Sequence, residues 1–412
     1  MAASTSSLAG APPLSDYKPR YIDIGINLAD PIFRGRYHGK SRHPDDLEGV
    51  VKRAHEMGCT KLIVTGSSFK SSRDALKLAA QFAGTVFSTA GIHPCSSSIF
   101  SPSRHKHHDE SQSEGEGEPE AEHTPACGLD PTKPILDGEG VDHTRSKTII
   151  ADLKTLITSV QRPFPSTPSP LVAFGEFGLD YDRLHYCSKE VQLHSFAAQL
   201  ELAASLTPQL PLFLHSRAAH ADFVRLLKDA FGPRLERLEK GGVVHSFTGT
   251  VEEMRELMDL GLYIGINGCS FKTAENCDVV KEIELSRLML ETDGPWCEVR
   301  PSHEGWKYLV DAAKAASSSG TATPVPGAET PPAGQQPKKQ GKKNQKKEPE
   351  VPDRFKVVKK EKWEEGAMVK GRNEPCTIER IATIVAGIKG VSVEEVCEAA
   401  WANTVKVFGV DQ

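Results

Sequence analysis

Four residues of the kind that bind metals each stand at the end of a short apolar run: Glu176, His215, His245 and Asp293. The runs, such as Pro211–Leu214, are too short for helices and are typical of buried strands. A carboxylate or imidazole in that position is costly unless it is paired or bound to a metal. If the strands are parallel, their C-terminal ends share one face, where a barrel enzyme keeps its catalytic groups. Two carboxylates and two histidines on that face predict a hydrolase with one or two divalent cations that activate water.

Taken singly, none of the four residues requires a metal. Glu176 could form a buried ion pair, and His215 could be a core histidine bonded to the backbone. His245 could belong to an ordinary turn, and Asp293 could cap a helix. The prediction rests on all four occurring in order, each after its own strand candidate and separated by one or two strand–helix units.

The elements that must position these residues alternate along the chain. Amphipathic helices are predicted over Asp45–Met57, Ser72–Phe82 and Glu190–Leu206. Repeated strand and helix predict a parallel sheet with right-handed crossovers, and eight such units close a (β/α)8 TIM barrel. An open doubly wound sheet is the alternative, but ligands after the fourth, fifth, sixth and eighth strands suit a ring better. The strand candidates are Tyr21–Ile26, Lys61–Thr65, Val86–Ala90, Leu171–Gly175, Pro211–Leu214, Gly242–Val244, Leu262–Ile266 and Leu288–Thr292.

The composition limits the class of protein. The net charge is −5, so binding of nucleic acid would need a local basic patch rather than a global basic field. Nine cysteines without a CxxC pair argue against a thiolate zinc site or a secreted disulfide framework. We expect no signal peptide and no membrane span, and a cytoplasmic or nuclear location.

Two segments lack apolar periodicity, and we expect both to be disordered insertions in a single domain over 20–412 that follows a disordered tail over 1–19. The first, over 96–147, contains His105, His107 and His108 before a run of glutamates, and we expect these histidines to be solvated rather than bound to metal. The second, over 315–352, is rich in proline and lysine. Its lysine run could bind nucleic acid or a protein, act as a nuclear-localisation signal, or be a solvated linker. The lysines are Lys338, Lys339, Lys342, Lys343, Lys346 and Lys347.

Seven motifs in order give the chain a resemblance to the TatD family of metal-dependent deoxyribonucleases. They cover nearly all of the chain outside the two insertions. The motifs are Tyr21–Leu28, Gly91–Pro94, Gly175–Tyr181, Leu214–Arg217, His245–Gly249, Glu291–Trp296 and Arg372–Pro375.

The resemblance implies a metallo-dependent hydrolase barrel of the amidohydrolase type that hydrolyses DNA phosphodiesters, trimming from the 3′ end. By that similarity Glu176 bridges two cations, Asp293 holds the first, and His215 and His245 hold the second. Apart from the resemblance, a carboxylate at position 293 could accept a proton from a metal-bound water, so Glu176 and Asp293 are the candidate catalytic residues. His93 either contacts the phosphate or protonates the leaving group, and a structural turn role before Pro94 is its alternative.

One departure from the family concerns the first metal. Many relatives open with Asp-x-His-x-His, whereas Gly25 and Asn27 occupy the two histidine positions here. The first site would then have fewer protein ligands and mostly oxygen donors, which favours Mg²⁺ or Mn²⁺ over Zn²⁺. Mg²⁺ is therefore the expected cofactor.

Four further residues are candidate substrate contacts: Asp180, Arg217, Trp296 and Arg372. The charged ones could contact DNA, with surface ion pairs as their alternative role. Trp296 could stack on a base or close the site as a packed lid.

Two other functions stay open at this point. The same barrel could hydrolyse a small ester, lactone or amide, since a fold alone decides no reaction. A non-enzymatic scaffold that uses the two insertions is also conceivable, although four intact ligand residues argue against it.

Overall fold

The computed structural model describes residues 17–102, 140–160, 169–318 and 351–410. The lysine run, the three histidines of the first insertion and nearly all of the predicted N-terminal tail lie outside the described residues. Among the described residues, no helix is long and apolar enough to cross a bilayer.

Eight parallel strands follow one another in chain order around a barrel, which confirms the (β/α)8 prediction over the open doubly wound sheet. The ring closes where the amide of Asp293 donates to the carbonyl of Gly25 at 2.8 Å, and the amide of Asn27 donates to Gly294 at 2.8 Å. The strands are β1 Tyr21–Ile26, β4 Cys59–Val64, β5 Val86–Ala90, β6 Leu171–Asp180, β7 Leu212–Arg217, β8 Gly242–Val244, β9 Tyr263–Ile266 and β10 Leu288–Leu290.

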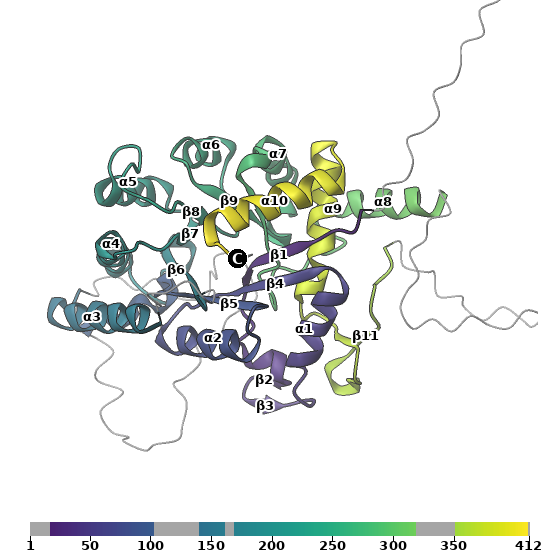
Figure 1. Ribbon diagram of the computed structural model, residues 1–412, viewed down its shortest axis with the longest axis horizontal. Helices are drawn as coiled ribbons and strands as arrows, with labels where there is room; N and C mark the ends of the chain where they lie inside the picture. Colours follow the sequence, from purple (N-terminus) through teal and green to yellow (C-terminus); the bar gives the residue numbers. More distant parts are fainter. Residues whose placement is uncertain (1–16, 103–139, 161–168, 319–350, 411–412) are drawn as a thin grey trace, which may run out of the picture.

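Helices lie outside the strands (Figure 1). The three predicted helices are present as α1, α2 and α4, and α2 begins earlier than predicted because Ser68 and Ser71 form a capping box. The helices are α1 Leu47–Glu56, α2 Phe69–Gln81, α3 His143–Val160, α4 Lys189–Ser205, α5 His220–Phe231, α6 Val251–Asp259, α7 Ala274–Glu282, α8 Trp306–Ser318, α9 Ile378–Lys389 and α10 Val393–Phe408. Two small sheets complete the fold: β2 Arg36–Tyr37 with β3 Lys40–Ser41, and β11 Val357–Val358 with β12 Met368–Val369.

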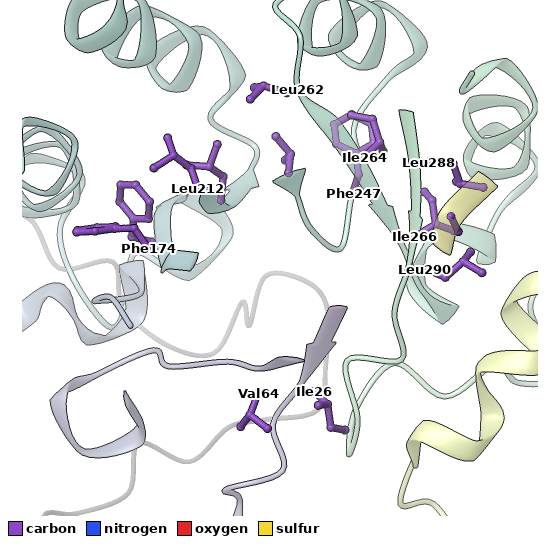
Figure 2. Packing of buried hydrophobic residues seen from close by; sticks show 14 of the residues in the cluster. Ile26, Val64, Phe174, Leu212, Phe247, Leu262, Ile264, Ile266, Leu288 and Leu290 are labelled. Atoms are coloured by element: carbon purple, nitrogen blue, oxygen red, sulfur yellow. The ribbon is translucent and has the colours of Figure 1, made fainter. Parts of the chain in front are cut away.

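The strands are apolar on both faces because they separate two layers of the core. Side chains such as Leu212, Ile264 and Leu288 belong to the larger apolar cluster, which also includes residues of the surrounding helices (Figure 2). A second cluster includes Ile24 and Phe213 from the strands and also Phe408 from the end of α10. Helix α10 therefore closes one end of the barrel with apolar side chains, which leaves the other end for polar groups.

The first insertion is shorter than predicted at both ends. Its Ser-rich beginning forms a 3₁₀ helix, Pro94–Phe100, and α3 already begins at His143. The reason is packing: Phe100 is fully buried, and the hydroxyl of Ser97 donates to that of Ser195 on α4 at 2.8 Å. The second insertion likewise begins later than predicted, since α8 continues to Ser318.

Strand β6 extends beyond its predicted end, so that Glu176 lies inside the strand rather than after it. The register against β7 shifts between Gly175 and Phe177, which is a bulge. Gly175 and Gly178 have φ values of 141° and 153°, and a Cβ at either position would clash with a carbonyl oxygen of β7. The two glycines therefore allow β6 to lie close against β7 while the bulge turns Glu176 into the barrel.

Replacement of Gly178 by alanine should lower the free energy of unfolding by about 2–4 kcal/mol, because the strain of the backbone and the clash with the carbonyl of His215 add. Gly39→Ala is the matched control: Gly39 also has a positive φ, but its Cβ would meet no heavy atom within 4 Å. Gly39→Ala should lower the free energy of unfolding by about 1 kcal/mol. Urea unfolding measures both, and equal losses would contradict the role assigned to the close strand contact.

Candidate metal centre

The carboxylate of Glu176 stands at the centre of three imidazoles. Its Oε1 lies 2.6 Å from Nε2 of His245, 3.2 Å from Nδ1 of His215 and 3.4 Å from Nε2 of His93. The side chains come from β5, β6, β7 and β8 or the residues just after them, so the C-terminal ends of four adjacent strands supply the group. Burial opposes the charge on Glu176, but His245 and His93 hold its pKa well below the usual value.

His215 is oriented by a second carboxylate. Its Nε2 lies 3.1 Å from Oδ2 of Asp180, which is fully buried. A carboxylate accepts the proton on Nε2, so the lone pair of Nδ1 faces Glu176 and His245. Burial opposes the charge on Asp180, but the hydrogen bond with His215 lowers the pKa of Asp180 to about 2. Asp180 was predicted to contact the substrate. In this structure it orients His215, a candidate metal ligand.

His245 lies between two carboxylates, and its contact with the second one is an ion pair rather than a hydrogen bond. Its Nδ1 lies 3.4 Å from Oε2 of Glu291, so Nε2 is the nitrogen that faces Glu176. Oε1 of Glu291 accepts hydrogen bonds from the amide of Ser246 at 2.5 Å and from Nδ2 of Asn267 at 3.2 Å. Burial opposes protonation of His245, but Glu176 and Glu291 raise its pKa well above the usual value.

His93 differs from the other two histidines in its tautomer. The amide of Cys95 donates to Nδ1 of His93 at 3.1 Å, so the proton of the neutral ring sits on Nε2, which points at Glu176. Burial lowers the pKa of His93 to about 3, so the ring is neutral at neutral pH. His93, Glu176 and His215 offer ligand atoms within 4.8 Å of one another, but the tautomer makes His93 a hydrogen-bond donor rather than a metal ligand.

Asp293 follows β10 at the same end of the barrel. Its Oδ1 accepts from Nδ2 of Asn27 at 3.0 Å, and the thiol of Cys297 lies 3.2 Å from its Oδ2. Burial raises the pKa of Asp293 to about 7; His245 opposes this shift, and Glu291 and Glu176 add to it. Asp293 thus lies in the electrostatic field of the Glu176 cluster, and its role as a metal ligand stays a prediction.

The departure at Gly25 has a steric counterpart in Glu291. A Cβ at position 25 would clash with Oε2 of Glu291, so a larger residue there would require the Glu291 side chain to shift. Glu291 was not predicted as a functional residue. The signal that could have found it is a charged residue directly after the apolar run Leu288–Leu290, which is the same signal that identified Asp293.

The donor set fits a divalent cation. Ligand atoms around one ion with bonds near 2.1 Å lie roughly 3.0–3.4 Å apart. Nδ1 of His215 lies at such distances from Oε1 of Glu176, 3.2 Å, and from Nε2 of His245, 3.3 Å, whereas Glu176 and His245 stand at the hydrogen-bond distance of 2.6 Å. Each of the two histidines has a buried carboxylate behind it, as metal-binding histidines commonly have. Without a cation, the buried carboxylate of Glu176 depends on a proton shared with His245 for compensation.

Two of the predicted substrate contacts lie beside this centre. Arg217 ends β7, two residues after His215, and its charge helps to lower the pKa of Asp180. Trp296 is half-buried, and its amide donates to the carbonyl of Asp293 at 3.0 Å. Their contact with a substrate stays a prediction.

Arg372 lies instead in a buried ion-pair cluster. Its guanidinium pairs with Asp46 and, at 2.7 Å, with Glu374, while Arg53 pairs with the same two carboxylates at 2.8 Å. Arg372 is 1% exposed. A guanidinium held between two carboxylates has little left to offer a phosphate, so Arg372 acts here as a structural residue.

The whole barrel matches one family. The model of the family described as TatD related DNase matches residues 22–409. The chain belongs to the TatD-related DNase family. It is 38% identical to "Deoxyribonuclease Tat-D" of Schizosaccharomyces pombe over 94% of this chain and 96% of that one. It is 34% identical to "3'-5' ssDNA/RNA exonuclease TatD" of Erwinia tasmaniensis over 67% of this chain and 80% of that one.

The fold comparison agrees with the family. The crystal structure of an uncharacterized amidohydrolase from Saccharomyces cerevisiae superimposes with a TM-score of 0.71 at 30% identity, covering 95% of this chain and 100% of that one. The barrel of the amidohydrolase type implied by the motifs is thereby confirmed.

Replacement of Asp180 by asparagine in this TatD-family protein should weaken metal binding by about 10–100-fold, because the proton on Nε2 of His215 loses its charged acceptor. Calorimetric titration of the metal-free protein with Mn²⁺ measures the effect. Asp182→Asn, at a half-buried position two residues further along the chain, is the control. If the two variants bind Mn²⁺ with equal affinity, Asp180 does not support the metal site.

Proposed function

We propose that the protein is a metal-dependent deoxyribonuclease that hydrolyses phosphodiester bonds of DNA from the 3′ end. The observation that carries the proposal is the carboxylate of Glu176 placed among three imidazoles at the C-terminal end of a TatD-family barrel. The name of the yeast relative supports DNA as the substrate, and that of the bacterial relative supports the 3′ to 5′ direction.

Each residue of the centre has a role in this reaction. Glu176, His215, His245 and Asp293 would hold the cation or cations. A bound divalent cation supplies a Lewis acid that makes water nucleophilic and neutralises charge on the phosphate. Asp293, fixed through Oδ1 by Asn27, takes the proton of the attacking water. His93, which carries its proton on Nε2, donates a hydrogen bond to a phosphate oxygen.

We propose Mg²⁺ as the physiological ion, with Mn²⁺ as the nearest substitute. Glu176 and Asp293 offer carboxylate oxygens, and Gly25 and Asn27 leave β1 without imidazole donors. Carboxylate oxygens favour hard cations. The alternative function is hydrolysis of a small ester, lactone or amide. No observation favours it over the nuclease.

Replacement of Glu176 by glutamine should leave a folded protein whose DNA hydrolysis falls at least about 10³-fold, since the group central to the cluster loses its charge. Hydrolysis of labelled single-stranded DNA with EDTA, Mg²⁺ or Mn²⁺ measures the loss, and circular dichroism checks the fold. Glu190→Gln, at an exposed position on α4, is the control. A near-normal rate in Glu176→Gln, or an undiminished rate in EDTA, would refute the assignment.

The direction of hydrolysis needs a separate test. A 3′-labelled single strand should release its label as mononucleotide from the start, while a 5′-labelled strand should shorten as a ladder. A circular single strand, which has no end, should stay intact. Cleavage of the circular strand would show that the protein is an endonuclease rather than an exonuclease. The proposed role of the metal would be unchanged.

A further inference from the structure

Two loops from opposite ends of the chain meet at the C-terminal end of the barrel. The loop after β1 contains Tyr37 and His43, and the segment before α9 contains Lys360 and Trp363. Nζ of Lys360 lies over the ring of Tyr37 at 4.8 Å, and the rings of His43 and Trp363 stack at 5.3 Å. The first loop joins β1 to α1, and the second segment, which follows α8, is bonded through Asn373 to the loop after β10, so both lie at the C-terminal end of the barrel.

The buried ion-pair cluster holds these loops together. Asp46 and Arg53 come from the first loop and α1, while Arg372 and Glu374 come from the second. Two cations and two anions compensate each other, so the cluster fixes the loops without adding net charge. One donor is left over: Nε of Arg372 is buried and has no hydrogen-bond partner among the described residues.

Arg372 lines a pocket of about 310 Å³ between the two loops. Lys359, Lys360 and Lys370 line it as well, against a single acidic group, Glu361. The ring of Tyr37 supplies an aromatic wall. We call this pocket, with Tyr37, Lys359, Lys360 and Lys370 as its defining residues, the lysine groove.

Basic side chains continue outward from the lysine groove. Arg36, Lys40 and Arg42 are exposed on and beside the β2–β3 hairpin, which carries Tyr37. Positive charge is thus concentrated locally in a protein whose net charge is −5. Such a local patch is what a polyanion requires of an otherwise acidic protein.

The lysine groove adjoins the loop that carries Asp293. Asn373, the neighbour of Arg372, donates through Nδ2 to the carbonyl of Thr292 at 2.9 Å and to that of Trp296 at 2.8 Å. Its amide also donates to the carbonyl of Pro295 at 3.0 Å. These hydrogen bonds fix the segment that carries the lysine groove to the loop that carries Asp293 and Trp296.

We propose that the lysine groove binds the phosphate backbone of single-stranded DNA several nucleotides away from the bond that is cleaved. This inference rests on the proposed nuclease function. Lysines are flexible point charges that suit a sequence-independent backbone contact. Nζ of Lys360 covers one face of the Tyr37 ring, so Tyr37 lines the groove as an aromatic wall and positions that lysine. The groove would therefore hold a long strand in place while its 3′ end is hydrolysed.

The test compares binding of short and long strands by the full-length protein. Fluorescence anisotropy in EDTA measures dissociation constants of labelled DNA of about 4 and about 16 nucleotides, lengths that bracket common single-strand sites. In wild type the long strand should bind more tightly. In Lys360→Gln/Lys370→Gln this advantage should fall about 5–10-fold, and the slope of log affinity against log salt should drop by about 1.4, or 0.7 for each lost phosphate contact.

Lys147→Gln/Lys154→Gln on α3, where both lysines are exposed, is the matched control and should keep the wild-type length dependence. An equal loss in both double variants, an unchanged length dependence in the groove variant, or equally effective competition by polyglutamate would overturn the proposal. These outcomes differ from failure of the nuclease itself, in which wild type would cleave neither strand with Mg²⁺ or Mn²⁺.

Discussion

A buried carboxylate at the C-terminal end of the barrel is the constraint on which the site depends. Glu176 is 7% exposed, and a charge in that position needs partners. Three imidazoles surround it, and each imidazole needs its own acceptor or donor: Asp180, Glu291 and the amide of Cys95. The polar network therefore extends outward through several strands, and their mutual register keeps its members in contact.

The strands were predictable because each is an apolar run bounded by turn residues, and the ligands were predictable because they follow such runs. The bulge of β6 was not predictable in the same way. It depends on how closely Gly175 and Gly178 approach the carbonyls of β7, a strand that comes later in the chain. A pattern within one segment carries no information on that approach, so the prediction ended β6 at Gly175.

The roles of single charges were the least predictable part of the site. Asp180 and Arg372 have the right residue types for substrate contacts, but a charge acts on the partner nearest to it in space. For Asp180 that partner is His215, and for Arg372 it is Asp46 together with Glu374. Asp46 is separated from Arg372 by almost the whole barrel in sequence, and only closure of the ring brings the two together.

Closure of the ring also explains how this chain manages without the two histidines of β1 found in many relatives. Asp23 on β1 accepts hydrogen bonds from the amide and hydroxyl of Thr292, and Asn27 donates to Asp293. Strand β1 thus positions the loop after β10 instead of supplying imidazoles. The space beside Gly25 belongs to Glu291, which supports His245. Gly25 and Glu291 are thus two parts of one arrangement, in which the Glu291 side chain occupies the space beside Gly25 and lies next to His245.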